Sequence, residues 1–301
     1  MLAIPLLLAL AAPASTTLAS ADTTPINCDN CATWNRPHAP FRLVGNSYYV
    51  GVEGISAVLI ADKAGLVLID GDLPQSASRI ADNIRKLGFR VEDVKWIVNS
   101  HAHFDHAGGI AALQRMSGAK VAASKLGAQA LRAGSASADD PQFVLGDVTN
   151  FPRIANVTEV ADGEVIALGR IRLTAHYTPG HTPGGTSWSW RDCAGEVCHD
   201  LVFADSLSPI SATGFRFTAD GGARVAQFRH SIAVVRALAC DVLVPTHPDA
   251  SDLFENQAKR GKNRKRDALI DANACRAYAD TADARLTKRV AEEQADPSAS
   301  H

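Results

Sequence analysis

The sequence predicts an α/β protein in which two sheets pack face to face, with helices on the outside. Three observations support this fold class. A stretch rich in strand-forming residues is followed by helical periodicity, and the same order then occurs a second time. No long low-complexity linker separates the two halves, so a single domain can accommodate them. The chain has 301 residues, of which 46% are hydrophobic, and this is enough for a large core.

The N-terminal segment has an apolar run over residues 2–12, followed by small and polar residues. This run is shorter than the roughly 20 residues that span a bilayer. It is typical of a secretory signal, and residues 19–21 offer a small-x-small cleavage site; a buried N-terminal helix is the alternative. We therefore expect a signal peptide over residues 1–21 and a single domain over residues 22–301. We also expect export to the periplasm or the medium, with no membrane span.

The first half alternates strands with helices. Strands are expected where β-branched and aromatic residues concentrate, and helices where apolar residues recur every three or four positions. The first helix is marked at both ends, by Pro74 and Gly88. In order, the expected elements are strands over residues 42–52, 55–62 and 65–71, a helix over 74–89, a strand over 94–100, a helix over 107–116, a strand over 119–124 and a helix over 125–134.

A loop rich in Ser, Asp and Pro, residues 135–142, leads into the second half. The basic run from Lys259 to Arg266 is expected to be a solvated helix entry, and a role in contacting anionic surfaces or steering substrate is the alternative. The net charge of −2 removes the electrostatic case for a nucleic-acid binder. The elements expected here are strands over residues 163–168, 171–177, 185–190 and 200–205, a helix over 222–238, a strand over 241–247 and a terminal helix from about Asn263.

The six cysteines form an even set, and in an exported protein they favour disulfides. Six thiols allow about 15 pairings, so the connectivity stays open. Cys193 and Cys198 flank AGEV between two strand-like runs, where a bridge would close a hairpin. Cys28 and Cys31 are also neighbours, and as a C-x-x-C pair they lack the second pair that a zinc motif needs. The best pairing adds Cys240 with Cys275.

The stretch HAHFDHAGG, residues 101–109, is a candidate metal-binding segment. His101 and His103 are two positions apart, which puts their side chains on one side of an extended segment but on opposite sides of a helix. Asp105 and His106 then lie at the entry to the next helix. Imidazoles and a carboxylate are ligands of Zn²⁺, and four of them so close together suit two ions about 3.5–4 Å apart. The two glycines that follow let backbone approach closely.

Two distant histidines are candidates to complete such a site. His181 lies in TPGHTPGGTSW, a turn crowded with Pro and Gly after a strand, and His247 ends a buried strand before Pro248. Rigid loops after strands are the usual location of functional side chains on such scaffolds. The remaining four internal histidines have no such setting and are expected to be ordinary residues: His38, His176, His199 and His230.

HAHFDHAGG, TPGHTPGGTSW, FADSLS and PTHP, in this order, resemble the metallo-β-lactamase superfamily, and more narrowly the third subclass of class B β-lactamases. The resemblance covers nearly the whole expected mature chain. It implies the metallo-β-lactamase fold, a four-layer αβ/βα sandwich with the metals at one edge. It also implies a disulfide matching Cys240–Cys275. The first two subclasses use a cysteine in the second metal site, whereas Ser206 stands at the matching position here.

The resemblance implies two Zn²⁺ ions per chain. The first would be held by His101, His103 and His181. The second would be held by the residues Asp105, His106 and His247.

The implied activity is hydrolysis of the β-lactam ring of penicillins, cephalosporins and carbapenems by a metal-bridging hydroxide, which confers antibiotic resistance. Asp105 would hold the hydroxide and carry its proton as the catalytic residue. Ser206 and Ser208 would bind the substrate carboxylate, with loop capping as the alternative. Trp34 is expected either near the pocket or in the core. The expected partner is a small β-lactam, and we expect a monomer.

Two other functions remain as alternatives. A glyoxalase II-like thioesterase or a lactonase of the same superfamily shares the opening motif, but it generally carries an aspartate that bridges both metals near FADSLS. Side chains alternate in an extended segment, so Asp205 and Ser206 cannot both face the metals. A zinc-dependent binding or structural protein is the second alternative, and its sites are normally closed by four protein ligands.

Overall fold

The computed structural model describes residues 21–143, 146, 149–260 and 267–295 of the chain. The expected signal peptide lies outside these residues except for Ala21. Most of the basic run, residues 261–266, also lies outside them. Within the described part, Arg260 pairs with Asp267 at 2.6 Å.

The first sheet has seven strands, in the order β1-β2-β3-β4-β5-β6-β7. The pairs from β1 to β4 are antiparallel, and those from β4 to β7 are parallel. Its strands are β1 Phe41–Arg42, β2 Ser47–Tyr49, β3 Val58–Asp62, β4 Gly65–Ile69, β5 Val94–Val98, β6 Lys120–Ser124 and β7 Val157–Val160.

The second sheet has five strands, in the order β12-β11-β10-β9-β8. Only the pair of β11 and β12 is parallel, so both sheets are mixed. Its strands are β8 Val165–Leu168, β9 Ile171–Tyr177, β10 Thr186–Ala194, β11 Val197–Ala204 and β12 Val242–Pro245.

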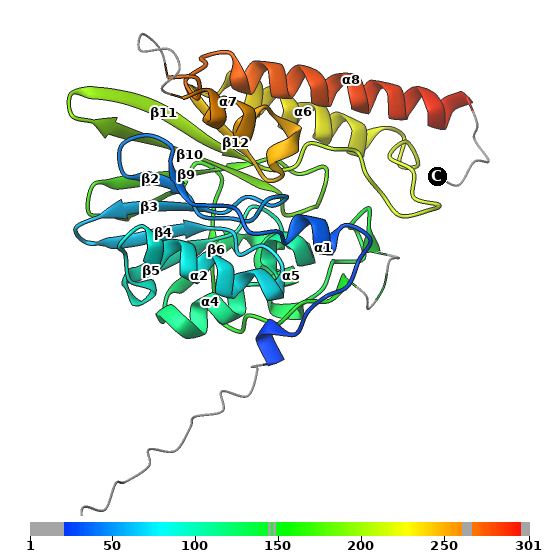
Figure 1. Ribbon diagram of the computed structural model, residues 1–301. Coiled ribbons are helices and arrows are strands. Elements are labelled where there is room, and N and C mark those ends of the chain that lie inside the picture. Colours follow the sequence, from blue (N-terminus) through cyan, green and yellow to red (C-terminus); the bar gives the residue numbers. More distant parts are fainter. Residues whose placement is uncertain (1–20, 144–145, 147–148, 261–266, 296–301) are drawn as a thin grey trace, which may run out of the picture.

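Helices cover the outer faces of the two sheets (Figure 1). α2, α4 and α5 lie on the first sheet, and α6 and α8 lie on the second. The helices are α1 Cys31–Trp34, α2 Ala77–Lys86, α3 Phe104–Ala107, α4 Ile110–Ser117, α5 Lys125–Ala133, α6 Ala223–Ala237, α7 Leu253–Lys259 and α8 Ala274–Ala295.

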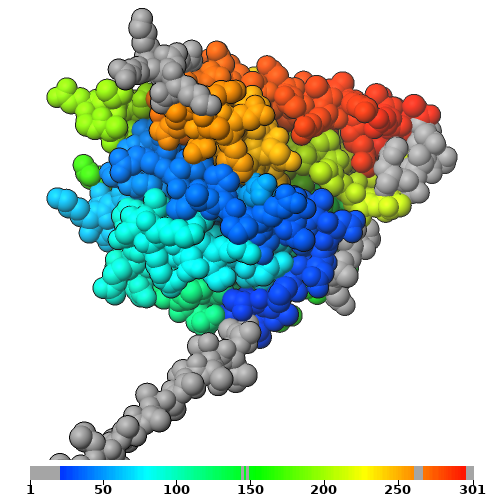
Figure 2. Space-filling model, viewed as in Figure 1, coloured from blue at the N-terminus to red at the C-terminus, as the bar shows by residue number. Residues whose placement is uncertain are grey.

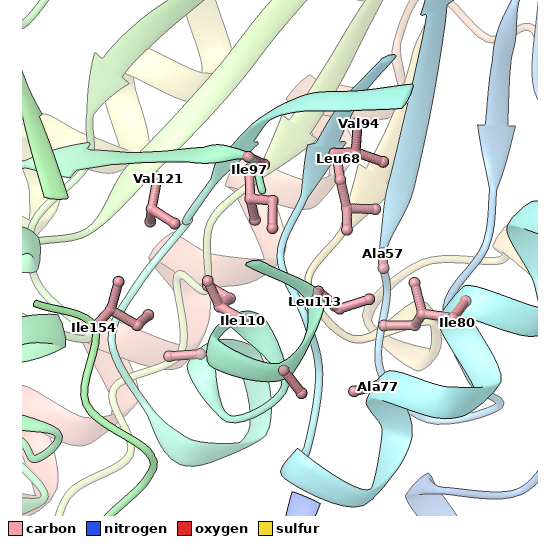
Figure 3. Packing of buried hydrophobic residues seen from close by; sticks show 14 of the residues in the cluster. Ala57, Leu68, Ala77, Ile80, Val94, Ile97, Ile110, Leu113, Val121 and Ile154 are labelled. Carbon is pink, nitrogen blue, oxygen red and sulfur yellow. The ribbon is translucent and has the colours of Figure 1, made fainter. Parts of the chain in front are cut away.

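Three layers of buried apolar side chains hold these elements together. Ile80 of α2 and Leu113 of α4 pack on the outer face of the first sheet (Figure 3). Successive strand residues point to opposite faces of a sheet. Phe203 therefore joins the layer between the sheets, while Val202 joins the layer under α6 and α8. Helix, sheet, sheet and helix make the four-layer αβ/βα sandwich that the sequence predicted.

The described elements differ from the expected ones at several boundaries. The terminal helix begins at Ala274 rather than near Asn263. The backbone N–H of Asp271 donates to Asp241 O at 2.7 Å, and that of Leu269 donates to the Asp267 carboxylate. These bonds hold a turn where the helix was expected. The strand expected over residues 42–52 is divided into β1 and β2. The short elements β7, α1 and α7 were not predicted, because they carry too few residues for a periodic pattern.

All three favoured disulfides are present: Cys28–Cys31, Cys193–Cys198 and Cys240–Cys275. Cys193 and Cys198 are directly opposite in the β10–β11 ladder, so this bridge closes the hairpin as expected. Cys240 and Cys275 join the start of β12 to α8.

The ends of several strands meet at one edge of the sandwich. β11 and β12 are parallel, so the segments that follow Ala204 and Pro245 leave the second sheet on the same side. The first sheet adds the segment after β5, because Ser100 O accepts a hydrogen bond of 2.8 Å from Thr186 N at the start of β10. This edge is where the sequence-predicted ligands are brought together.

Candidate metal centre

The histidine cluster leaves β5 as an extended segment, as its spacing predicts. His103 has φ −93° and ψ 156°, and it caps the short helix α3. The α3 helix carries Asp105 and His106 and is closed by hydrogen bonds from His106 N and Ala107 N to His103 O. The change from strand to helix directs these two residues to a second group, which adjoins the first because the ring centroids of His101 and His106 are 4.2 Å apart. The segment over residues 101–109 therefore supplies side chains to two neighbouring groups.

The first group of converging side chains is formed by His101, His103 and His181. Their ring centroids lie 4.9–5.0 Å apart. Each ring offers one nitrogen, and these three atoms lie within 4.8 Å of one another. All three side chains are buried. His181 reaches this point from the turn after β9, about 80 positions away in the chain.

Each of the three rings has a second nitrogen, which points away from the other two rings. That nitrogen has its own hydrogen-bond partner. His101 Nδ1 lies 2.8 Å from Asp205 Oδ1, and His103 Nε2 lies 3.1 Å from both oxygens of Asp140. His181 Nδ1 donates to the backbone oxygen of Ser208 at 2.9 Å. Such partners orient an imidazole and set which of its nitrogens is free for a metal.

The second group is formed by Asp105, His106 and His247. Asp105 Oδ2 lies 3.3 Å from His106 Nε2 and 3.4 Å from His247 Nε2, and these two nitrogens are 3.2 Å apart. His247 donates from Nδ1 to Gly54 O at 2.8 Å. His101, Asp105 and His106 also offer donor atoms within 4.8 Å of one another, so the two groups adjoin.

The electrostatics favour the metal-binding forms of His101, His181 and Asp105. Burial lowers the pKa of His181 to about 3 and that of His101 well below its usual value, so both imidazoles are neutral. Burial opposes ionisation of Asp105, but the imidazoles of His106 and His247 hold its pKa well below the usual range. Burial also acts to lower the pKa of His103 and His247, but the carboxylates of Asp140 and Asp105 more than offset it, so that both pKa values are raised.

The donor set fits a metal ion. His101 Nε2 is one of several buried side-chain atoms of the described residues that have no hydrogen-bond partner. A buried polar atom without a partner is costly, and an ion that binds the His101 nitrogen removes that cost. Nothing in the described geometry offers another partner to His101 Nε2.

The two candidate substrate-binding serines lie beside His181. Ser206 Oγ and Ser208 Oγ are 2.9 Å apart, and Ser208 Oγ lies 3.3 Å from His181 Nδ1. Ser206 is buried, whereas Ser208 is partly exposed. The ring centroid of Trp34 lies 5.1 Å from that of His247, so Trp34 lies at the candidate centre as well as against a small apolar cluster.

Asp205 stands behind His101. Its side chain is fully buried and contacts His101 Nδ1 from the side opposite to Nε2, so Asp205 and Ser206 diverge as the alternation of an extended segment predicts.

Sequence reasoning did not find Asp140, Gly54 or the role of Asp205. Asp140 lies in the loop over residues 135–142, to which the sequence analysis assigned no role. Its bonds to His103 link that loop to the histidine cluster, and Gln142 of the same loop lies 3.4 Å from His181. The DDP sequence at this loop was the available signal, because a carboxylate before proline in a rigid turn is placed reproducibly.

Comparison with protein-family models and with solved structures finds metallo-β-lactamases. A family model described as the metallo-beta-lactamase superfamily matches residues 50–247. A subclass B3 metallo-β-lactamase isolated from a soil metagenome library is 50% identical, with a TM-score of 0.83 over 87% of this chain and 99% of that one. The Rm3 metallo-β-lactamase is 46% identical, with a TM-score of 0.85 over 89% of this chain and 99% of that one.

More distant similarities are also found. BJP-1, a subclass B3 metallo-β-lactamase of Bradyrhizobium japonicum, is 32% identical over 88% of this chain and 98% of that one, with a TM-score of 0.80. A hydroxyacylglutathione hydrolase of Maricaulis maris is 31% identical over 129 residues, which is 42% of each protein. This chain thus matches less than half the length of that curated relative.

Proposed function

The chain belongs to the metallo-β-lactamase superfamily, and from this premise we propose that it is a zinc-dependent β-lactamase of subclass B3. The proposed reaction is hydrolysis of the β-lactam ring of penicillins, cephalosporins and carbapenems. The observation that carries the proposal is the pair of adjoining donor groups, His101/His103/His181 and Asp105/His106/His247, at the edge of the sandwich. Similarity to two solved metallo-β-lactamases over 99% of their length supports it, and the first of these is of subclass B3.

We propose that two Zn²⁺ ions bind here. The first would be held by His101 Nε2, His103 Nδ1 and His181 Nε2, which are the ring nitrogens that face away from Asp205, Asp140 and Ser208 O. The second would be held by Asp105 Oδ2, His106 Nε2 and His247 Nε2. Zinc with three protein ligands supplies a Lewis acid and lowers the pKa of water to about 7, which provides a nucleophile at neutral pH.

The chain's own residues would bind and orient the substrate and hold a proton. Asp105, kept ionised between two imidazoles, can accept a hydrogen bond from the attacking water. That it also carries the proton of this water stays a prediction of the resemblance. Ser206 and Ser208 offer two hydroxyls next to His181, where they can donate to the carboxylate that β-lactam antibiotics carry.

Asp205 argues against a thioesterase or lactonase. Those enzymes are expected to carry an aspartate in the region of FADSLS that contacts both metals. Asp205 instead contacts the outer nitrogen of His101 and belongs to neither donor group. The matches to hydroxyacylglutathione hydrolases cover only 29–52% of those proteins. The lactamase assignment is therefore favoured.

We also propose that the protein is exported. The described residues contain three disulfides and no free cysteine, and disulfides persist in oxidising compartments. No described helix combines the length and the apolar character that crossing a bilayer requires. A single domain over residues 22–301 is supported by the layer between the sheets, which draws side chains from Leu43 to Leu269. The monomeric state stays a prediction.

The test uses the purified full chain with a carbapenem, a penicillin and S-lactoylglutathione, each with and without a chelator. We expect loss of β-lactam absorbance that the chelator stops, and no change in the thioester. Asp105→Ala is expected to lose turnover of both antibiotics by at least about 10²-fold, the lower range for a missing acid–base group, while circular dichroism stays unchanged. Hydrolysis of the thioester but not of the lactams would refute the proposal.

A further inference from the structure

His247 is held differently from the other histidines of the centre. Its side chain is 24% exposed, whereas those of His101, His103 and His106 are at most 8% exposed. Close packing fixes the rotamers of buried rings. Because protein surrounds His247 on fewer sides, a small number of contacts must set its orientation.

Two contacts do so. The Nδ1 atom donates to Gly54 O at 2.8 Å, and the indole of Trp34 lies against the ring, with centroids 5.1 Å apart and planes inclined by 42°. The hydrogen bond fixes which nitrogen is protonated, and the indole restricts rotation of the ring about its Cβ–Cγ bond. Together they keep Nε2 directed at Asp105 and His106.

Trp34 and Gly54 belong to one packed unit. Gly54 N donates to Trp34 O at 3.0 Å, and Glu53 N donates to Arg36 O at 2.9 Å. The backbone at positions 53–54 is therefore hydrogen-bonded to the backbone at positions 34–36. A Cβ atom at position 54 would lie 2.3 Å from Trp34 Cδ1, which is far closer than such atoms pack. Glycine at position 54 is therefore required by this contact.

The N-terminal turn, residues 28–36, cannot hold its shape alone. The α1 helix within it has only four residues, which is too short to be stable in water. The Cys28–Cys31 disulfide closes the turn, and Cys31 and Trp34 pack on Val52 and Ile55. Figure 2 shows the blue surface of this N-terminal segment adjoining the orange surface of the chain that follows β12. The turn also lies before residues 50–247, the part that the family model matches.

We propose that the N-terminal turn is a positioning element for the second metal site, in which Trp34 and Gly54 hold His247 in its metal-binding orientation. The inference rests on the proposed role of His247 as a ligand. Partners that stand behind a metal-bound histidine typically contribute about 10–100-fold to metal affinity. Loss of the indole should weaken the second ion by this factor and leave the first ion unaffected, because the indole has no described contact with His101, His103 or His181.

The experiment is equilibrium dialysis of the purified full chain against buffered free Zn²⁺, with the number of ions per chain and both affinities measured. Trp34→Ala is expected to weaken only the second ion, by about 10–100-fold. Trp34→Phe, which keeps a ring against His247, should restore most of that affinity. Gly54→Ala, which pushes the indole from the loop, should weaken the second ion as well. Co²⁺ absorption spectra then report the ligand field of the second site independently of activity.

Trp96→Ala is the matched control, since Trp96 is also a partly buried tryptophan but lies on β5 against Lys120. It is expected to lower thermal stability without changing either zinc affinity. If the affinity for the second zinc ion is unchanged in both Trp34→Ala and Gly54→Ala, this inference is wrong but the proposed function is unaffected. Fewer than two ions in the unchanged protein would overturn the proposed function and this inference together. Equal weakening of both ions would also overturn it, because that result indicates a general loss of structure.

Discussion

Gly109→Ala tests whether the second glycine after the histidine cluster is required because another backbone segment lies too close for a side chain. A Cβ atom at position 109 would lie 2.1 Å from Gly71 O, whereas such atoms are essentially never closer than 3.0 Å. The two backbone segments must therefore separate by about 1 Å. Two hydrogen bonds cross this contact, Gly71 N to His106 O at 2.9 Å and Gly109 N to Asp72 O at 3.0 Å. A separation of this size breaks both.

The expected loss follows from those two bonds. A buried hydrogen-bonding group left unmade costs about 1–3 kcal/mol, so the free energy of unfolding should fall by about 2–6 kcal/mol. That is a large part of the 5–15 kcal/mol typical of a domain. Denaturation in urea with zinc removed measures it. Gly118→Ala is the control, because Gly118 has φ +71° and no atom within 4 Å of an added Cβ. It should cost about 1–2 kcal/mol from left-handed strain alone. A loss at Gly109 no larger than at Gly118 would refute the reasoning.

Two further predictions concern charged side chains. Asp140→Ala removes both 3.1 Å bonds to His103 and should weaken binding of the first zinc ion by about 10–100-fold in equilibrium dialysis. Asp139→Ala, which changes an exposed neighbour, should leave that affinity unchanged. Equal effects of the two substitutions would contradict the role of Asp140. Burial opposes ionisation of Glu293, but bonds from Arg289 and the loop around Thr218 lower its pKa below the ordinary 4.5. Its stabilisation is therefore present above pH 4.5 and lost as pH falls through the lowered pKa. Glu293→Gln should lower the free energy of unfolding by about 1.5–3 kcal/mol at pH 7 in urea denaturation, and a difference that persists unchanged at pH 3 would show this account to be wrong.

The sequence predicted the donor residues because they are encoded locally. The spacing of His101 and His103 specifies an extended segment, and both lie on one side of it as expected. His181 and His247 could be selected because prolines and glycines make their loops rigid after strands. The short disulfides followed from closeness along the chain, and all three favoured pairings are present.

The start of the terminal helix could not be predicted in the same way. Its true beginning at Ala274 depends on the bond from Asp271 N to Asp241 O. That bond competes with helix formation and involves a residue 30 positions earlier in the chain. Local propensity contains no information about such a partner.

By itself, then, the amino-acid order determined which side chains can serve as ligands, the alternation of strands and helices, and the family. The tertiary structure alone decided which residue stands behind each candidate ligand. Asp205 meets His101 across 104 positions, and Gly54 meets His247 across 193. The physical reason is that periodicity and turn chemistry act over a few residues, whereas these contacts exist only after two sheets have packed and brought their strand ends to one edge.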